Sequence, residues 1–202
     1  MNKTVIGVLA SGRGSNLQAI VDAIESGRLD AKIGAVISDN PKANVLTRMA
    51  DTDIPTVCID RRQFSSRQEF EAAVAEELNI RHVELVVLAG FMRILTPYFI
   101  ERFRGKIMNI HPALLPAFPG ENAQQQALEY GVKVSGCTVH FIDEGMDTGP
   151  IILQEAVPVL EDDTVDTLSE RILHTEHILY PRALALYCEG RLQVEGRRVR
   201  IE

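Results

Sequence analysis

The stretch Val5-Ile6-Gly7-Val8-Leu9-Ala10-Ser11-Gly12-Arg13-Gly14-Ser15-Asn16 decides the fold. Its first half is a short apolar run, typical of a central parallel strand. Its second half is a glycine-rich turn, and apolar residues then recur at helical spacing over Leu17–Ile24. A strand, a glycine-rich turn and a helix in succession aim backbone N–H groups at an anion, so the pattern favours a phosphate monoester site at Gly14, Ser15 and Asn16. An ordinary βα turn is the alternative.

Two familiar nucleotide motifs do not match this turn. It lacks the Lys-Ser/Thr ending of a triphosphate-binding loop. Leu17 also occupies the place where a dinucleotide fingerprint requires a third glycine.

Strand and helix patterns alternate along the rest of the first half. Apolar strand patterns lie at 33–37, 55–59 and 84–90, and helical patterns lie at 42–51 and after the capping residues Ser65 and Ser66. Beyond a strand that ends at His111, the sequence predicts strands at 134–142 and 151–157. A long helix follows from Thr164 to about Cys188, which Pro181 should bend or divide, and a hairpin at 191–200 completes the pattern. The fold class predicted is α/β, a doubly wound and mostly parallel sheet with a mixed C-terminal half.

Composition narrows the class of partner. The net charge of −7 and the isoelectric point near 5.3 argue against binding to nucleic acid, which relies on a basic surface. No apolar run approaches the roughly 18–20 residues that span a bilayer, and the start does not resemble a signal peptide. Three widely spaced cysteines favour reduced thiols, so we expect a cytoplasmic protein without a membrane partner.

The stretch Lys106–Pro116 carries the most promising chemistry. Asn109 and His111 are two apart at a strand end, so their side chains should leave the same face together. With a carboxylate from the loop 143–147, such a pair can hold a carbonyl group. The Asn and a protonated His donate to a developing oxyanion, and the carboxylate favours the charged His. A strand-end turn with an idle His is the alternative.

Other segments suggest a surface that binds a flat ligand, and none suggests a metal site. Phe91-Met92-Arg93-Ile94-Leu95 places one Arg between large apolar residues, which suits a flat ligand with an acidic tail or, equally, a surface Arg. Arg67 opposes the dipole of the helix that it begins, which hints at another partner. The cysteines and histidines lack the spacing of metal ligands.

Four motifs resemble those of the folate-dependent formyltransferases, and within them the phosphoribosylglycinamide formyltransferases of purine biosynthesis. The resemblance covers essentially the whole chain. In chain order, the motifs are Gly14-Ser15-Asn16, Ala89-Gly90-Phe91-Met92-Arg93-Ile94-Leu95, Asn109-Ile110-His111-Pro112 with Leu114-Leu115-Pro116, and Asp147-Thr148-Gly149-Pro150. The third motif and the distant Asp are shared by the wider superfamily, which uses 10-formyltetrahydrofolate. The Gly-Ser-Asn loop and the chain length point to the glycinamide enzymes.

The resemblance implies one formyltransferase domain over residues 1–202, with a phosphate-binding half near 1–105 and a folate and catalytic half near 106–202. The implied reaction moves a formyl group from 10-formyltetrahydrofolate, a co-substrate, to the amine of 5-phosphoribosylglycinamide (GAR), without a metal, in a monomer or homodimer. The implied catalytic residues are Asn109, His111 and Asp147. The implied acceptor contacts are Gly14, Ser15, Asn16, Pro112 and Glu176, and the folate contacts are Arg67, Met92, Arg93, Ile94, Leu95, Asn109, Asp143, Glu144 and Asp147.

One departure and three rivals accompany the resemblance. Glu121-Asn122-Ala123-Gln124 stands where family members often carry His residues, so we expect altered loop mobility and pH profile near residues 118–126. A formyltetrahydrofolate hydrolase and a methionyl-tRNA formyltransferase usually carry an extra domain, which 202 residues do not accommodate. A non-catalytic nucleotide-binding module would use the Gly14-Ser15 loop and leave Asn109, His111 and Asp147 without a role.

Overall fold

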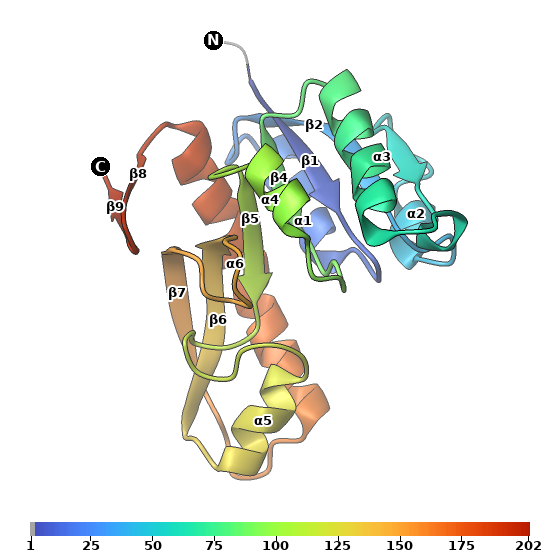
Figure 1. Cartoon of the computed structure of the whole chain (residues 1–202). Coiled ribbons are helices and arrows are strands. Elements are labelled where there is room, and N and C mark those ends of the chain that lie inside the picture. Colours follow the sequence, from blue (N-terminus) through green and yellow to red (C-terminus); the bar gives the residue numbers. More distant parts are fainter. Residues whose placement is uncertain (1–2) are drawn as a thin grey trace. The chain divides into compact units, whose positions relative to one another are not determined.

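The computed structural model describes residues 3–202, and these divide into two compact units whose boundary falls between Met108 and Asn109. The first unit contains β1 (Thr4–Leu9), α1 (Ser15–Glu25), β2 (Ala31–Ser38), α2 (Asn44–Arg48), β3 (Thr56–Cys58), the 3-10 helix η1 (Arg61–Gln63), α3 (Arg67–Ile80), β4 (Leu85–Leu88) and α4 (Pro97–Arg102). Strand β5 (Ile107–His111) carries the chain into the second unit. The second unit continues with α5 (Ala123–Tyr130), β6 (Val134–Phe141), β7 (Ile151–Pro158), α6 (Val165–Cys188), β8 (Leu192–Glu195) and β9 (Arg198–Ile201) (Figure 1).

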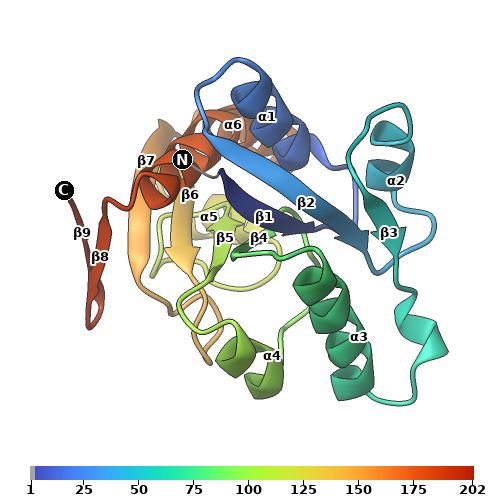
Figure 2. The same ribbon diagram turned by 90° about the horizontal axis from the view of Figure 1, so that it is seen from above.

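The first unit is built on a parallel sheet with strands in the order β3-β2-β1-β4. Its strands are apolar runs because both faces are covered: α1 lies on one face, and α3 and α4 lie on the other (Figure 2). Gly7 of β1 allows α3 to pack closely, since a Cβ atom there would lie 2.4 Å from Leu78 Cδ2 of α3. The predicted doubly wound, parallel arrangement is confirmed.

The strand order creates a switch point at the carboxyl edge of this sheet. The chain passes outward from β1 to β2 and β3, and then returns to place β4 on the other side of β1. The loops that follow β1 and β4 therefore diverge around one crevice, which is where open α/β sheets bind ligands.

The second unit carries a mixed set of strands in the order β5-β6-β7-β9-β8. Strands β6 and β7 are antiparallel, β9 adds to β7 in parallel, and β8 and β9 form the predicted terminal hairpin (Figure 1). The mixed C-terminal half is thus confirmed. No helix among residues 3–202 is long and apolar enough to cross a membrane.

Two local details of the prediction differ in the structure. The helix expected at 42–51 contains only Asn44–Arg48. Pro181 does not divide α6, which continues through it as one helix of 24 residues with a capping box at Thr164. Thr and Pro are favoured at the N-cap and in the first turn of a helix, and Pro97 does begin α4, but the Thr96 side chain does not cap that helix because it bonds to Glu71 instead.

Strand β6 offers a sharp test of the packing in the second unit. A Cβ atom added to Gly136 would lie 2.1 Å from the Glu155 carbonyl oxygen of the neighbouring strand β7. We therefore expect Gly136→Ala to lower the free energy of unfolding by about 1–3 kcal/mol in urea titrations.

The adjacent Ser135 is the matched control. Its buried hydroxyl has no hydrogen-bond partner among the residues described. Ser135→Ala removes this unsatisfied group and should leave stability within about 0.5 kcal/mol of wild type or raise it. Equal losses in both variants would contradict the close contact at Gly136.

Candidate active site

Two hydrogen bonds join the loops that follow β1 and β4 at the switch point of the first unit. Ser11, which follows β1, donates its backbone N–H to the Gly90 carbonyl at 3.1 Å. The Ser11 hydroxyl in turn accepts the backbone N–H of Met92 at 3.0 Å. Beside these ties lies a hollow of about 400 Å³, whose lining comes from loops that follow β1, β2, β3 and β4. The lining residues are Ser11, Asp39, Asn40, Pro41, Asp60, Arg62, Met92 and Arg93.

The glycine-rich turn has the geometry expected of an anion-binding loop. Gly14 adopts a left-handed conformation with φ of 74°, and a Cβ atom there would lie 2.7 Å from Val45 Cγ2. Helix α1 begins at Ser15 without a side-chain cap. Helix α2 supports the turn, because the Val45 N–H and the Arg48 guanidinium donate to the carbonyls of Gly12 and Arg13. Such an uncapped helix start leaves backbone N–H groups available to an anion.

The predicted folate wall, the apolar side chains of Met92, Ile94 and Leu95 with Arg93 among them, lies in the same unit, on the segment that follows β4. Met92 and Ile94 are exposed and Leu95 is buried. Arg93 forms an ion pair with the buried Asp39 and lies 6.0 Å above the Phe70 ring. Arg67 is exposed, and among the described residues it has no ion pair. Asp39 has no motif that marks it; the turn cluster after β2 is its only sequence signal.

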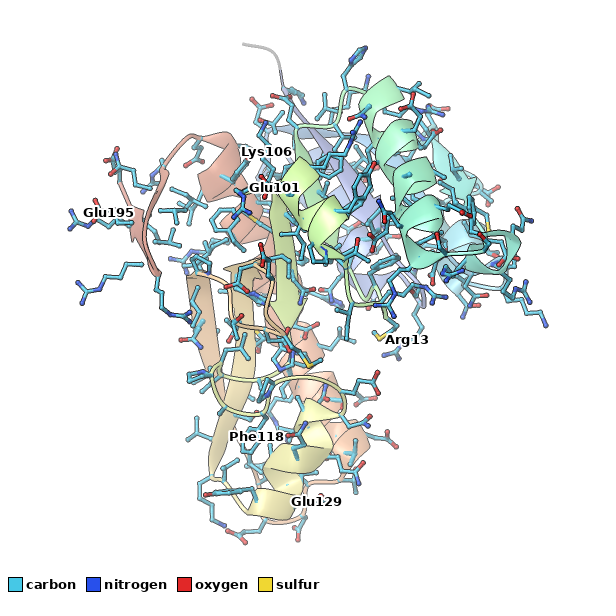
Figure 3. All side chains as sticks on the ribbon, viewed as in Figure 1. Arg13, Glu101, Lys106, Phe118, Glu129 and Glu195 are labelled. Carbon is cyan, nitrogen blue, oxygen red and sulfur yellow. The ribbon has the colours of Figure 1, made fainter. Side chains whose placement is uncertain are left out.

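Asn109 and His111 lie on β5, two residues apart, as the alternation predicts. His111 is buried, and each of its ring nitrogens faces an oxygen. The Nε2 atom lies 2.8 Å from the Phe118 carbonyl oxygen, and the Nδ1 atom lies 3.4 Å from Asp147 Oδ2. Figure 3 shows Phe118 beside helix α5. The centroids of the Phe118 and Tyr130 rings are 5.9 Å apart, and the rings meet edge to face.

Asp147 is the point where three segments of the second unit meet. Its carboxylate accepts the Gly120 N–H at 2.7 Å, faces His111 through Oδ2, and lies 3.7 Å from His140 Nε2 through Oδ1. The residue has a φ of 53°, which is unusual for Asp. His111, Asp147 and His140 therefore form one cluster, which Asn109 joins through His140.

His140 is part of this cluster, and the sequence interpretation missed it. Its Nδ1 atom lies 2.9 Å from the Phe141 carbonyl oxygen, and Asn109 Nδ2 lies 3.4 Å from its Nε2 atom. Burial lowers the pKa of His140, outweighing the hydrogen bond to Phe141 and the charge of Asp147. A neutral ring that donates from Nδ1 must accept at Nε2, so His140 orients the Asn109 amide.

Thr138 is the second residue that was missed. Its hydroxyl donates to the Ala113 carbonyl at 2.7 Å and accepts the Leu115 N–H at 3.0 Å, and Gln154 donates to it as well. This buried hydroxyl holds the loop that follows His111. Thr138 and His140 are two apart on β6, so the spacing that singled out Asn109 and His111 could also have found them.

The remaining predicted residues of the second unit have different surroundings. Asp143 folds its own loop by accepting from the Gly145 N–H and the Thr148 hydroxyl, whereas Glu144 is exposed. Glu176 is buried on α6. The burial of Cys137 and the negative charge of Glu176 together raise the pKa of the Cys137 thiol to about 12. Pro112 is half-buried after β5. Among residues 3–202, no group of three or more His, Cys, Asp or Glu side chains is arranged to hold a metal ion.

The chain belongs to the formyl transferase family, whose sequence profile matches residues 4–184. It is 45% identical to phosphoribosylglycinamide formyltransferase of Bacillus subtilis strain 168 over 88% of this chain and 91% of that protein. The crystal structure of glycinamide ribonucleotide transformylase 1 from Symbiobacterium toebii superposes with a TM-score of 0.97 at 53% identity, covering 98% of this chain and 94% of the other.

A longer relative shares the same region. The chain is 47% identical over 96% of its length to the trifunctional purine biosynthetic protein adenosine-3 of Chironomus tentans. It spans only 14% of that protein. This chain therefore corresponds to one region of that longer, trifunctional protein.

Acid should destabilise the protein through His140. In the unfolded chain the ring titrates near pH 6.5, whereas burial lowers its pKa in the native state. Below about pH 6.5 the unfolded state binds a proton that the native state does not, so the free energy of unfolding falls as pH decreases toward the native pKa. Urea titrations between about pH 8 and pH 5 should show a weaker fall for His140→Gln than for wild type.

The exposed His174 gives the matched control on α6. His174→Gln should keep the wild-type dependence on pH. An unchanged dependence in His140→Gln would contradict the neutral, buried state assigned to His140.

Proposed function

We propose that this chain transfers the formyl group of 10-formyltetrahydrofolate to the amine of GAR, giving formyl-GAR and tetrahydrofolate in purine biosynthesis. One observation carries the proposal: in a member of the formyl transferase family, the Asp147 carboxylate faces the imidazoles of His111 and His140, and the Asn109 amide contacts His140. The relatives named above as glycinamide formyltransferases support the choice of acceptor.

The proposed chemistry is acyl transfer through a tetrahedral intermediate. The neutral amine attacks the formyl carbon, a C–N bond forms, and the formyl oxygen becomes an oxyanion. The Asn109 amide and the Nε2–H of His111 donate to that oxyanion, and Asp147 stabilises the charged imidazole. The bond from carbon to the folate nitrogen N10 then breaks, and a proton from the attacking amine passes to that nitrogen, directly or through water.

Phe118 has a defined part in this scheme. Its carbonyl oxygen lies 2.8 Å from His111 Nε2, which is the atom that should donate to the substrate. We expect the formyl oxygen to displace this carbonyl when the substrate binds. The loop from Phe118 to Gly120 would then release His111 while the Gly120 N–H keeps Asp147 in place.

The first unit is proposed to hold the parts of the substrates that do not react. Gly14, Ser15 and Asn16 would bind the phosphate of GAR through backbone and side-chain donors. Met92, Ile94 and Leu95 would bind the pteridine and benzoyl rings of the folate, and Arg93, already paired with Asp39, would lie beside its acidic tail.

A turnover assay tests the proposal. The protein is incubated with GAR and 10-formyltetrahydrofolate, and formyl-GAR, tetrahydrofolate and free formate are measured. We expect formyl-GAR and tetrahydrofolate in equal amounts. Formate without formyl-GAR would indicate a hydrolase, and binding without turnover would indicate a nucleotide-binding module.

Replacing the central acid or base should slow the reaction without unfolding the protein. His111→Ala removes an oxyanion donor, and Asp147→Asn removes the charge beside it, so each should lower kcat by about 10²–10³. The exposed Asp162 provides a control, since Asp162→Asn makes the same chemical change at a position outside the candidate site. Near wild-type kcat in either active-site variant would contradict the assigned roles.

A negative charge in the glycine-rich loop should weaken the binding of GAR and leave the binding of 10-formyltetrahydrofolate nearly unchanged. In Ser15→Asp the added carboxylate repels the phosphate of GAR, so the KM for GAR should rise at least about tenfold, which corresponds to about 1.4 kcal/mol. The KM for 10-formyltetrahydrofolate should stay within about twofold of wild type. Ser15→Ala adds no charge and should raise the KM for GAR far less. Equal effects on both substrates would argue against a phosphate site.

A further inference from the structure

The segment Gly90–Thr96 in the first unit exposes apolar side chains without belonging to a helix or a strand. Met92 and Ile94 are 76% and 61% exposed, whereas Leu95 is buried. Exposed apolar residues on an irregular connection are typical of a binding surface. Such a segment has no backbone ladder of its own, so its conformation depends on ties to neighbouring elements.

Two ties fix the first part of the segment. The Met92 N–H donates to the Ser11 hydroxyl at 3.0 Å. The Arg93 guanidinium pairs with Asp39 at the end of β2 and lies over the ring of Phe70, a residue of α3.

A buried carboxylate fixes the last part. Glu71 on α3 is only 2% exposed. It accepts the backbone N–H of Thr96 at 2.9 Å, and its second oxygen accepts the Thr96 hydroxyl. A buried carboxylate is costly unless it is hydrogen-bonded, and Thr96 supplies both of these donors.

The role of Thr96 is unusual for a residue at the start of a helix. Ser66 and Thr164 use their hydroxyls to cap α3 and α6. Thr96 stands at the same position before α4 but gives its hydroxyl to Glu71. The interaction therefore joins the end of the segment to another helix instead of stabilising α4 itself.

We propose that Glu71 is a positioning residue for the folate co-substrate. By binding Thr96, it holds the segment Gly90–Thr96 in the conformation that exposes Met92 and Ile94. The inference rests on the proposed function, because it takes those side chains as the folate wall. Glu71 itself touches no substrate.

The effect of Glu71 should be specific to the folate. The glycine-rich loop proposed for GAR is held at Gly12 and Arg13 by the Val45 N–H and the Arg48 guanidinium from α2, and it meets the segment Gly90–Thr96 at Ser11, through Gly90 and Met92. None of these involves α3. Loss of Glu71 should therefore disturb folate binding and leave acceptor binding nearly intact.

The test compares three variants with a control on the same helix. Glu71→Ala removes both acceptors, Glu71→Gln keeps one for the Thr96 N–H, and Thr96→Val removes only the hydroxyl. Glu76→Ala removes an exposed carboxylate from α3 and is the control. The readouts are kcat, the KM for each substrate, the Kd for tetrahydrofolate, and amide hydrogen exchange of residues 90–96.

We expect Glu71→Ala to raise the folate KM and the tetrahydrofolate Kd by about tenfold, with the KM for GAR within about twofold. Exchange of residues 90–96 should be faster in this variant and unchanged in Glu76→Ala. Thr96→Val should show a smaller effect in the same direction, and Glu71→Gln should recover most of the affinity.

Two results would overturn the inference. One is a folate KM in Glu71→Ala equal to that of Glu76→Ala, and the other is an equal rise in KM for both substrates. If Glu71→Ala does not fold, Thr96→Val decides, and wild-type folate affinity and exchange in it would also refute the inference. Failure of the wild-type protein to bind tetrahydrofolate would instead refute the proposed function, while the exchange comparison would still report on the tie between Glu71 and Thr96.

Discussion

The carboxylate of Asp147 is the constraint on which the candidate site depends. It lies within the loop between β6 and β7, in the left-handed backbone conformation with φ of 53°, and the Gly120 N–H fixes one of its oxygens. The loop reaches this position because Gly149 lets the chain pass close to β6: a Cβ atom there would lie 1.8 Å from the Phe141 carbonyl oxygen. Loop geometry, and not a strand or helix, therefore places the acid.

The same carboxylate faces two imidazoles whose surroundings differ. His140 donates from Nδ1 to a carbonyl and is so deeply buried that the neutral ring is favoured, which makes its Nε2 atom an acceptor for Asn109. His111 meets an oxygen at each nitrogen and is placed to act as a donor. His140 thus orients the Asn109 amide and His111 is placed to donate a hydrogen bond, a difference that follows from the hydrogen-bond partners of each ring.

Sequence reasoning found the parts of the molecule that have a local signal. The glycine-rich turn, the alternation at Asn109 and His111, and the doubly wound strand pattern each depend on neighbouring residues, and their predicted structures are confirmed. His140 was missed although its spacing from Thr138 matches that of Asn109 and His111, because both faces of β6 are buried from Ser135 to Phe141 and little contrast in polarity separates them. In the sequence, nothing distinguishes Glu71 from the exposed carboxylates of its helix, and its partner Thr96 is 25 residues away. No spacing rule relates Asp147 to His111 either: the residue patterns indicated a carboxylate from the loop 143–147, and only the resemblance to a family singled out Asp147.

Nitrogen-15 NMR of the histidine side chains tests the central claim most directly, since it reports which ring nitrogen carries the proton. At neutral pH the account predicts that His140 is neutral with its proton on Nδ1, and that His111 carries a proton on Nε2. A His140 ring that is charged, or that carries its proton on Nε2, could not accept from Asn109 and would contradict the arrangement described here.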